Sequence, residues 1–143
     1  MNRTLPRHIL FYASRVLLDD AGKPLSGMGV LLDRLSGYDR VALCADPDEL
    51  ELVRGAYGSL ISEGVRLAGV TGDEAPRRSY PAFEVEIDLV VDADPLRAMA
   101  AVDNGLRTSI FVDAARLYRD LGLWGIVPLN HSLKDVRETL GLK

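Results

Sequence analysis

Short, continuous apolar runs alternate along this chain with segments whose apolar residues recur at helical spacing. The runs have the length and composition of strands that are buried on both faces of a sheet. They occupy residues 8–13, 40–45, 65–70, 87–91 and 108–112, and residues 123–127 predict a last edge strand.

The segments between these runs predict helices. Asp46 and Asp94 are each followed by proline, which is the order of an N-cap and a first helical residue. We expect the helix after Asp46 to continue to Gly64 and the helix after Asp94 to end near Gly105. The apolar face expected for the second of these helices consists of Leu96, Met99, Ala100 and Val102. Further helices are expected at 28–35, 113–121 and 132–140.

Regular alternation of strand and helix predicts an α/β fold. We expect one domain over residues 1–143, a doubly wound, mostly parallel sheet with helices on both faces and no inserted cap domain. Ligands of such folds bind beyond the carboxyl ends of the strands, so candidate chemistry is sought there.

Composition narrows the class of protein. The chain has 143 residues, a formal net charge of −4 and a pI near 5.1, so nucleic acid is not an expected partner. No apolar run is long enough to cross a bilayer, and no secretory leader is evident, so no membrane partner and a cytoplasmic location are expected. One cysteine, Cys44, cannot form an internal disulfide or a cysteine-cluster metal site.

Two carboxylates follow the fourth apolar run. Asp92 and Asp94 are two residues apart, so both side chains can face a common cleft where a hard cation such as Mg²⁺ binds carboxylate oxygens. For Asp94 alone, the role of helix N-cap is the favoured interpretation. For Asp92, a functional origin and an ordinary surface role are equally supported.

Residues 87–95, the helical segment 98–105 and the strand-like run 108–112 together resemble the acidic fourth motif of the haloacid dehalogenase-like superfamily. In those phosphohydrolases a buried strand ends in acidic residues that hold Mg²⁺. The order of elements at the front of the chain is similar to the opening of the same family. The resemblance extends over residues 8–113 and implies a haloacid dehalogenase-like fold.

Three of the four motifs of that family are altered here. The positions of its nucleophile and general-acid aspartates hold Tyr12 and Ser14. The Ser or Thr of its second motif is replaced by Ala45, and no lysine occupies the middle of the chain. Arg77 or Arg78 could supply the charge of the missing lysine as an anion contact, although arginine and lysine are not interchangeable.

The resemblance therefore implies a fold that is retained without its catalysis. We expect a binding, assembly or structural protein, including a component of a phage or mobile element (in host cytoplasm or virion), with a protein partner or a homo-oligomer. No cofactor is expected beyond weak binding of Mg²⁺ by Asp92 and Asp94. The alternative is a divergent Mg²⁺-dependent phosphohydrolase that uses Asp19 or Asp20 as well. A third hypothesis is a sensor that binds a small molecule in the pocket where the family binds phosphate.

Several other residues have side chains that could take part in chemistry or binding. Tyr12 is interpreted either as a plug of the former phosphate pocket or as an ordinary strand tyrosine. Cys44 is expected to be buried and inert, and His8 to be a surface residue at the start of a strand. Trp124 is expected in the core rather than in an exposed patch, and Ser14 has no histidine close in sequence for a triad.

Overall fold

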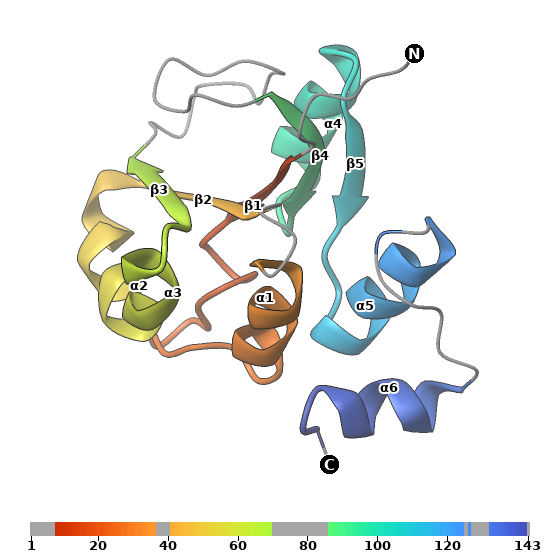
Figure 1. Cartoon of the computed structure of the whole chain (residues 1–143). Helices are drawn as coiled ribbons and strands as arrows, with labels where there is room; N and C mark the ends of the chain where they lie inside the picture. The colour runs from red at the N-terminus through yellow and green to blue at the C-terminus, as the bar shows by residue number, and fades with distance from the viewer. Residues whose placement is uncertain (1–7, 37–40, 70–85, 125, 127–131, 143) are drawn as a thin grey trace.

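The computed structural model describes residues 8–36, 41–69, 86–124, 126 and 132–142 of the chain (Figure 1). Five strands form one sheet in which all neighbouring strands are parallel, with the order β3-β2-β1-β4-β5. The strands are β1 (His8–Tyr12), β2 (Val41–Ala45), β3 (Arg66–Gly69), β4 (Ile87–Asp92) and β5 (Arg107–Ile110). The expected α/β fold with a parallel sheet is therefore confirmed.

The order of the strands contains a point where the direction of winding reverses. The chain adds β2 and β3 on one side of β1, then returns to add β4 and β5 on the other side. The carboxyl ends of β1 and β4 flank this switch point, which is where doubly wound folds bind their ligands. The last residues of these two strands are Tyr12 and Asp92.

Helices cover both faces of the sheet, but unequally. The larger core, on one face, includes side chains of five helices, whereas only α4 contributes to the smaller core on the other face. Helix α4 lies beside β4, apart from the other helices (Figure 1). The helices are α1 (Met28–Ser36), α2 (Leu50–Ala56), α3 (Gly58–Ser62), α4 (Pro95–Asp103), α5 (Ala114–Leu123) and α6 (Leu133–Thr139), with a 3-10 turn, η1 (Pro47–Glu49), before α2.

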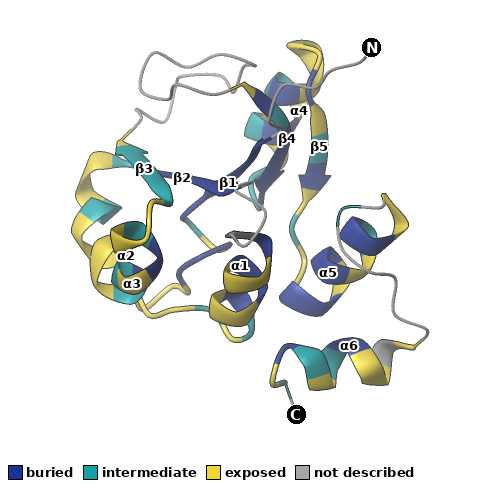
Figure 2. Ribbon diagram, in the orientation of Figure 1, coloured by how far each residue is buried: buried dark blue, intermediate teal, exposed yellow. Residues whose placement is uncertain are grey.

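Strand β1 lies at the centre of both cores. Ile9 and Phe11 face the larger core, and Leu10 and Tyr12 face the smaller one, as the two-residue period of a strand requires. Every residue of β1 and β2 is buried, whereas the edge strand β3 is only half-buried (Figure 2). This burial explains why the central strands are apolar runs rather than alternating ones.

Helix caps follow the sequence closely in three cases. The side chain of Asp94 accepts a hydrogen bond from the Leu96 amide at 3.0 Å, which confirms its role as N-cap of α4. Asp113 caps α5 and Ser132 caps α6 in the same way. These polar side chains satisfy amides that have no partner within their own helix.

The segment after β2 is less regular than predicted. Asp46 makes no side-chain cap bond, and the expected single helix is divided into η1, α2 and α3. The division between α2 and α3 falls at Tyr57, whose backbone leaves the helical region with φ −124° and ψ 27°. Tyr57 is buried, and its hydroxyl donates to the Leu17 carbonyl at 2.6 Å, so a tertiary contact accompanies the break.

The expected edge strand at 123–127 is wrong for residues 123, 124 and 126, and residues 125 and 127 lie outside the described part of the chain. Leu123 is the last residue of α5, and the Trp124 amide donates to the Asp120 carbonyl at 3.0 Å, which continues the helical bonding. Trp124 is also 39% exposed, so its expected place in the core is wrong as well. Among the described residues, β5 is thus the edge strand on the side of β4, and β3 is the edge strand on the side of β2.

The apolar face predicted for α4 is also wrong. Ala98 and Ala101 are buried against the sheet, whereas Leu96, Met99 and Val102 are 78%, 62% and 58% exposed. Small side chains let α4 approach the sheet closely, and its large apolar side chains are left on the outer side. No helix of the described residues is long and apolar enough to span a membrane.

Candidate functional site

The switch point brings two of the predicted site residues together. Leu10 pairs with Val90 in the register of β1 and β4, and these residues share one face of the sheet. Continuing the same register two residues along places Tyr12 beside Asp92 on that face. Both side chains are buried, at 2% and 0% exposure respectively.

The remaining predicted residues lie elsewhere. Ala45 ends β2 but faces the larger core, on the opposite side of the sheet from Tyr12. Ser14 is half-buried in the turn after β1, where it bridges to Leu18. Arg77 and Arg78 lie outside the residues that the structure describes.

The principal partner of Asp92 is a residue that sequence reasoning missed, Arg97. Its Nε donates to Asp92 Oδ2 at 2.5 Å, and its Nη2 donates to Asp92 Oδ1 at 2.9 Å. The Asp94 amide donates to the same Oδ1 at 3.0 Å. Both carboxylate oxygens of Asp92 are therefore engaged, in the two-pronged geometry that makes arginine–carboxylate pairs strong.

Arg97 also lies over Tyr12. Its guanidinium carbon is 4.1 Å from the centre of the Tyr12 ring, within the range of a cation–π interaction. The Arg97 side chain is only 13% exposed, so water competes little for it. Asp92, Arg97 and Tyr12 form one compact cluster, which we name the arginine cluster.

Backbone geometry explains how Arg97 reaches this place. Asp94 is the N-cap of α4, so Arg97 is the third residue of the first helical turn. A cation is disfavoured there because the helix dipole is positive at its N-terminus, and a partner carboxylate offsets that cost. An arginine in the first turn of a helix, five residues after Asp92, is the sequence feature from which the Arg97–Asp92 pair could have been predicted.

The charges of the cluster reinforce one another. Burial acts to lower the pKa of Arg97, but the hydrogen bonds and charge of Asp92 outweigh burial, so the pKa is raised and the guanidinium stays protonated. The Asp92 carboxylate is thus paired with the Arg97 guanidinium, which carries a permanent positive charge.

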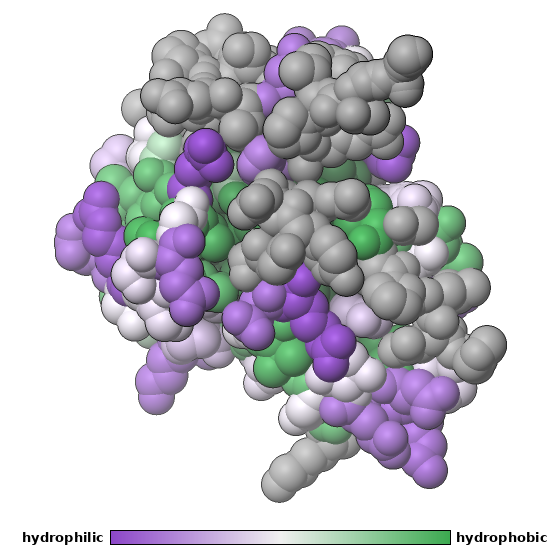
Figure 3. Space-filling model, in the orientation of Figure 1, coloured by the Kyte–Doolittle hydropathy of each residue, from purple (hydrophilic) through white to green (hydrophobic). Residues whose placement is uncertain are grey.

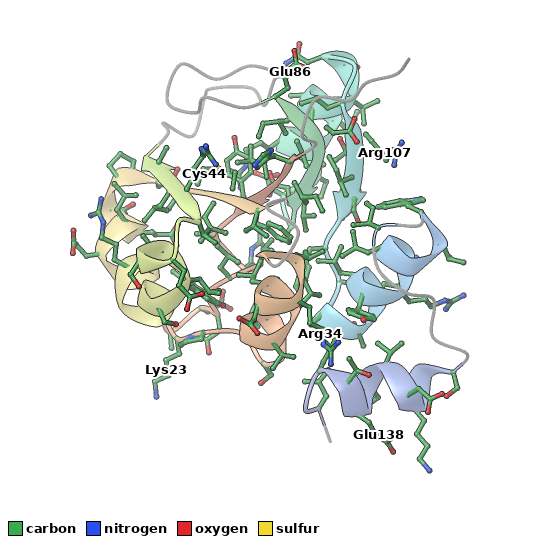
Figure 4. All side chains as sticks on the ribbon, in the orientation of Figure 1. Lys23, Arg34, Cys44, Glu86, Arg107 and Glu138 are labelled. Carbon is green, nitrogen blue, oxygen red and sulfur yellow. The ribbon has the colours of Figure 1, made fainter. Side chains whose placement is uncertain are left out.

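Cys44 adjoins the cluster from β2. It pairs with Tyr12 in the strand register, faces the smaller core and is fully buried, as predicted (Figure 4). Burial is the main reason that the pKa of its thiol is raised well above the ordinary value, and the charge of Arg97 offsets only part of this effect. A thiol of this kind is a poor nucleophile.

A tight turn closes the carboxyl end of β1. The Ala13 carbonyl accepts hydrogen bonds from the amides of Val16, Leu17 and Leu18 at 2.9–3.2 Å. Arg15, at φ 60°, is the one non-glycine residue with positive φ in the described part of the chain. Ser14 lies within this turn and is half-buried.

His8 is far from this end of the sheet. It starts β1, at the opposite end from Tyr12, and it is 3% exposed, so the prediction of a surface residue is wrong. His8 pairs with Ile87, a residue of the smaller core, and the register of β1 and β4 shifts between His8 and Ile9. It contributes nothing to the arginine cluster.

The side chains at the switch point do not fit the Mg²⁺ ion that the family resemblance implies. Asp92 and Asp94 are the residues that could hold it, but Asp92 is bound by Arg97 and Asp94 caps α4. No group of three or more histidine, cysteine, aspartate or glutamate side chains able to hold a metal occurs among the described residues. Asp19, proposed as an extra acid, is exposed, and its Oδ1 accepts from the amides of Ala21 and Lys23.

Comparisons with known proteins add no family to this picture. No protein-family model matches the chain, and no curated protein matches it significantly. The arginine cluster and the fold therefore carry the functional argument.

Proposed function

We propose that this chain is a non-catalytic relative of the haloacid dehalogenase-like phosphohydrolases that acts as a protein-binding or assembly domain. The observation that carries the proposal is the pairing of Arg97 with Asp92. In the family that the sequence resembles, the acidic end of the corresponding strand holds Mg²⁺. Here a guanidinium of the same chain neutralises the corresponding carboxylate.

The pairing of Arg97 with Asp92 makes the binding of Mg²⁺ unfavourable, and with it catalysis that depends on Mg²⁺. A cation that enters beside Asp92 must displace Arg97 or lie close to it, and two cations at a few ångströms repel one another. Mg²⁺ also gives up its water reluctantly and needs several oxygen ligands. One carboxylate already paired with arginine offers too little to offset that cost.

Tyr12 at the end of β1 and Ser14 just after it support the same conclusion. Phosphoryl transfer through a covalent intermediate needs a nucleophile and a group that protonates the leaving oxygen. Tyr12 is buried against Arg97, and Ser14 lies within the turn after β1. Neither side chain is a carboxylate, so neither supplies the paired acids that this reaction uses.

A binding role is supported by the outer surface of α4. Leu96, Met99 and Val102 point away from the core of their own chain. Exposed apolar side chains that gather on one element are typical of interaction surfaces.

The test is an assay with a generic phosphomonoester and Mg²⁺ on the wild-type chain, Asp92→Asn and the control Asp103→Asn. Asp103 is exposed at the end of α4, so its variant changes charge without touching the cluster. We expect all three proteins to hydrolyse the ester no faster than buffer with Mg²⁺.

The contrary result is turnover by the wild-type chain that Asp92→Asn abolishes and Asp103→Asn retains. Circular dichroism of each variant separates loss of activity from loss of fold. A Tyr12→Phe variant then reports whether the Tyr12 hydroxyl takes part. That pattern would establish the alternative, a divergent phosphohydrolase.

A further inference from the structure

Exposed apolar side chains gather along one edge of the sheet. The described residues include nine large apolar side chains that are exposed, and seven of them lie on α4, on β5 and just after it, or at the end of α5. These seven, which we call the edge surface, are Leu96, Met99, Val102, Ile110, Val112, Leu123 and Trp124. In the space-filling view, apolar atoms reach the margin of the molecule beside the end of α5 (Figure 3).

The α4 part of this surface leans toward β5. Arg97 leaves the helix on the side of β1, because it contacts Asp92 and Tyr12. At about 100° per residue, Met99 and Val102 leave the helix on the opposite side, toward the sheet edge. Ile110 pairs with Asp92 in the register of β4 and β5, so it lies on the same face as α4.

The other face of the same edge is apolar as well. Arg107 pairs with Leu89, which belongs to the larger core, so Arg107 lies on the α5 face. Its guanidinium carbon is 5.8 Å from the centre of the Trp124 ring. Arg107 projects from the outer strand of the sheet (Figure 4). Apolar side chains thus flank β5 on both faces.

The outer edge of β5 carries backbone groups that can pair with another strand. The Phe111 amide donates to the Asp92 carbonyl at 2.8 Å, so Phe111 turns its polar backbone groups toward β4. In a parallel pair alternate residues do this, and Thr108 and Ile110 therefore turn theirs outward. Val112 follows at a bend just beyond the end of β5. No strand of the described residues pairs with that edge. Such edges are templates for another strand.

We propose that β5 pairs with β5 of a second copy of this chain, antiparallel and about a twofold axis that passes beside Ile110. A twofold axis makes the surface its own partner, and an antiparallel strand edge meets this requirement. Residues whose backbone groups turn outward must pair with residues of the same kind in the second copy. This requirement allows the axis to pass beside Ser109, Ile110 or Phe111, but not between two residues. The paired sheet would continue across both subunits.

Charge selects among these registers. With the axis at Ile110, Arg107 lies near Asp113 of the partner subunit, and the twofold repeats this pair. Asp113 follows the end of β5 beyond a bend at Val112, and its Oδ1 already accepts from the Arg116 amide as the cap of α5. Both Arg107 and Asp113 are exposed, and opposite charges that meet across an antiparallel pair are favourable. The same register places Thr108 opposite Val112 of the partner subunit. This complementarity within one sequence favours a second copy over an unrelated strand.

The inference deepens the proposed function by naming the partner, and the two fail independently. Hydrolysis by the cluster at Asp92 would overturn the non-catalytic role but leave the dimer unaffected. A monomeric chain would overturn the dimer and leave the arginine cluster as it is.

Light scattering and sedimentation of the full chain test the state of association. We expect a dimer at micromolar concentration that Met99→Lys, Ile110→Lys and Arg107→Glu each weaken, with a dimer Kd raised roughly tenfold or more. Leu52→Lys is the matched control, since Leu52 is 47% exposed and lies on α2. A monomer at every concentration, or a dimer that the three variants leave unchanged, overturns the proposal.

Disulfide trapping tests the register. Cα atoms of a hydrogen-bonded antiparallel pair are about 5.5 Å apart, a separation that a disulfide spans. Ile110→Cys should therefore cross-link to itself under mild oxidation, whereas Leu52→Cys should not. Thr108→Cys and Val112→Cys should cross-link to each other when mixed, and slowly when alone. Equal cross-linking at all four positions, or none at Ile110→Cys, contradicts the assigned axis.

Discussion

Removing Arg97 is the perturbation whose effect follows most directly from the structure. Arg97→Met keeps an unbranched side chain of similar length but deletes both hydrogen bonds to Asp92. The Asp92 carboxylate has no exposed surface, so water cannot replace the lost donors. What remains is one hydrogen bond, from the Asp94 amide.

The magnitude follows from that burial. Breaking a buried ion pair by removing one partner costs about 3–5 kcal/mol, because an uncompensated charge is left in the interior. The retained Asp94 amide places the expected loss near the lower end, at about 3 kcal/mol, to which the lost contact with Tyr12 adds about 0.5–1 kcal/mol. Asp92→Asn should cost less, since the Arg97 side chain is already 13% exposed and can turn to solvent.

The assay is urea unfolding followed by circular dichroism, with both single variants and the double variant Asp92→Asn/Arg97→Met. The double variant should recover part of the loss, giving a coupling free energy of about 1–3 kcal/mol. A loss below about 1 kcal/mol for Arg97→Met, or no coupling in the double variant, is the contrary result, because it would mean that Asp92 is hydrated without Arg97.

Three further predictions concern the framework around the cluster. Gly27 has φ +84°, and an added Cβ would lie 3.1 Å from the Cβ of Ala114, so Gly27→Ala should lower the free energy of unfolding by about 2 kcal/mol. Gly29 lies in α1 with open space around it, so Gly29→Ala should raise the free energy of unfolding by about 0.5–1 kcal/mol in the same assay. Since burial raises the pKa of the Cys44 thiol, Ellman's reagent at pH 8 should leave the native chain unmodified and react with one thiol after unfolding; rapid reaction of the native chain would contradict the structure. Burial raises the pKa of Tyr57 to about 12 from about 10 in the unfolded chain, so the neutral phenol stabilises the fold below pH 10 and this contribution is lost between pH 10 and 12; Tyr57→Phe should flatten that decline in an alkaline unfolding series, and an unchanged decline would refute the assignment.

The fold was predictable because its local features agree with its tertiary environment. The strands at the centre of the sheet are buried on both sides, so their apolar runs stand out in the sequence. Asp94 and Ser132 act as caps through bonds to amides two or three residues away, which are local interactions. Periodicity and caps therefore placed most elements within a few residues.

The orientation of α4 was not predictable from periodicity. Leu96, Met99 and Val102 have the spacing of a core face, yet Ala98 and Ala101 are the residues that pack on the sheet. Hydrophobic spacing finds an apolar stripe but does not tell whether the stripe faces the core or a partner.

The candidate site was predicted in part. Tyr12 and Asp92 were found because the ends of parallel strands meet at one edge of the sheet. Arg97 was missed because its role depends on the sheet bringing Tyr12, 85 residues earlier in the chain, under its guanidinium. A cation in the first turn of a helix is the local feature that points to such a partner.

We propose that Arg97 occupies the place of a bound cation beside Asp92. The decisive experiment is calorimetric titration of the wild-type chain with Mg²⁺, with Asp92→Asn as the comparison. We expect no saturable heat up to several millimolar Mg²⁺ and identical traces for the two proteins. Saturable binding by the wild-type chain below about 1 mM that Asp92→Asn removes would show that Asp92 holds Mg²⁺ in spite of Arg97.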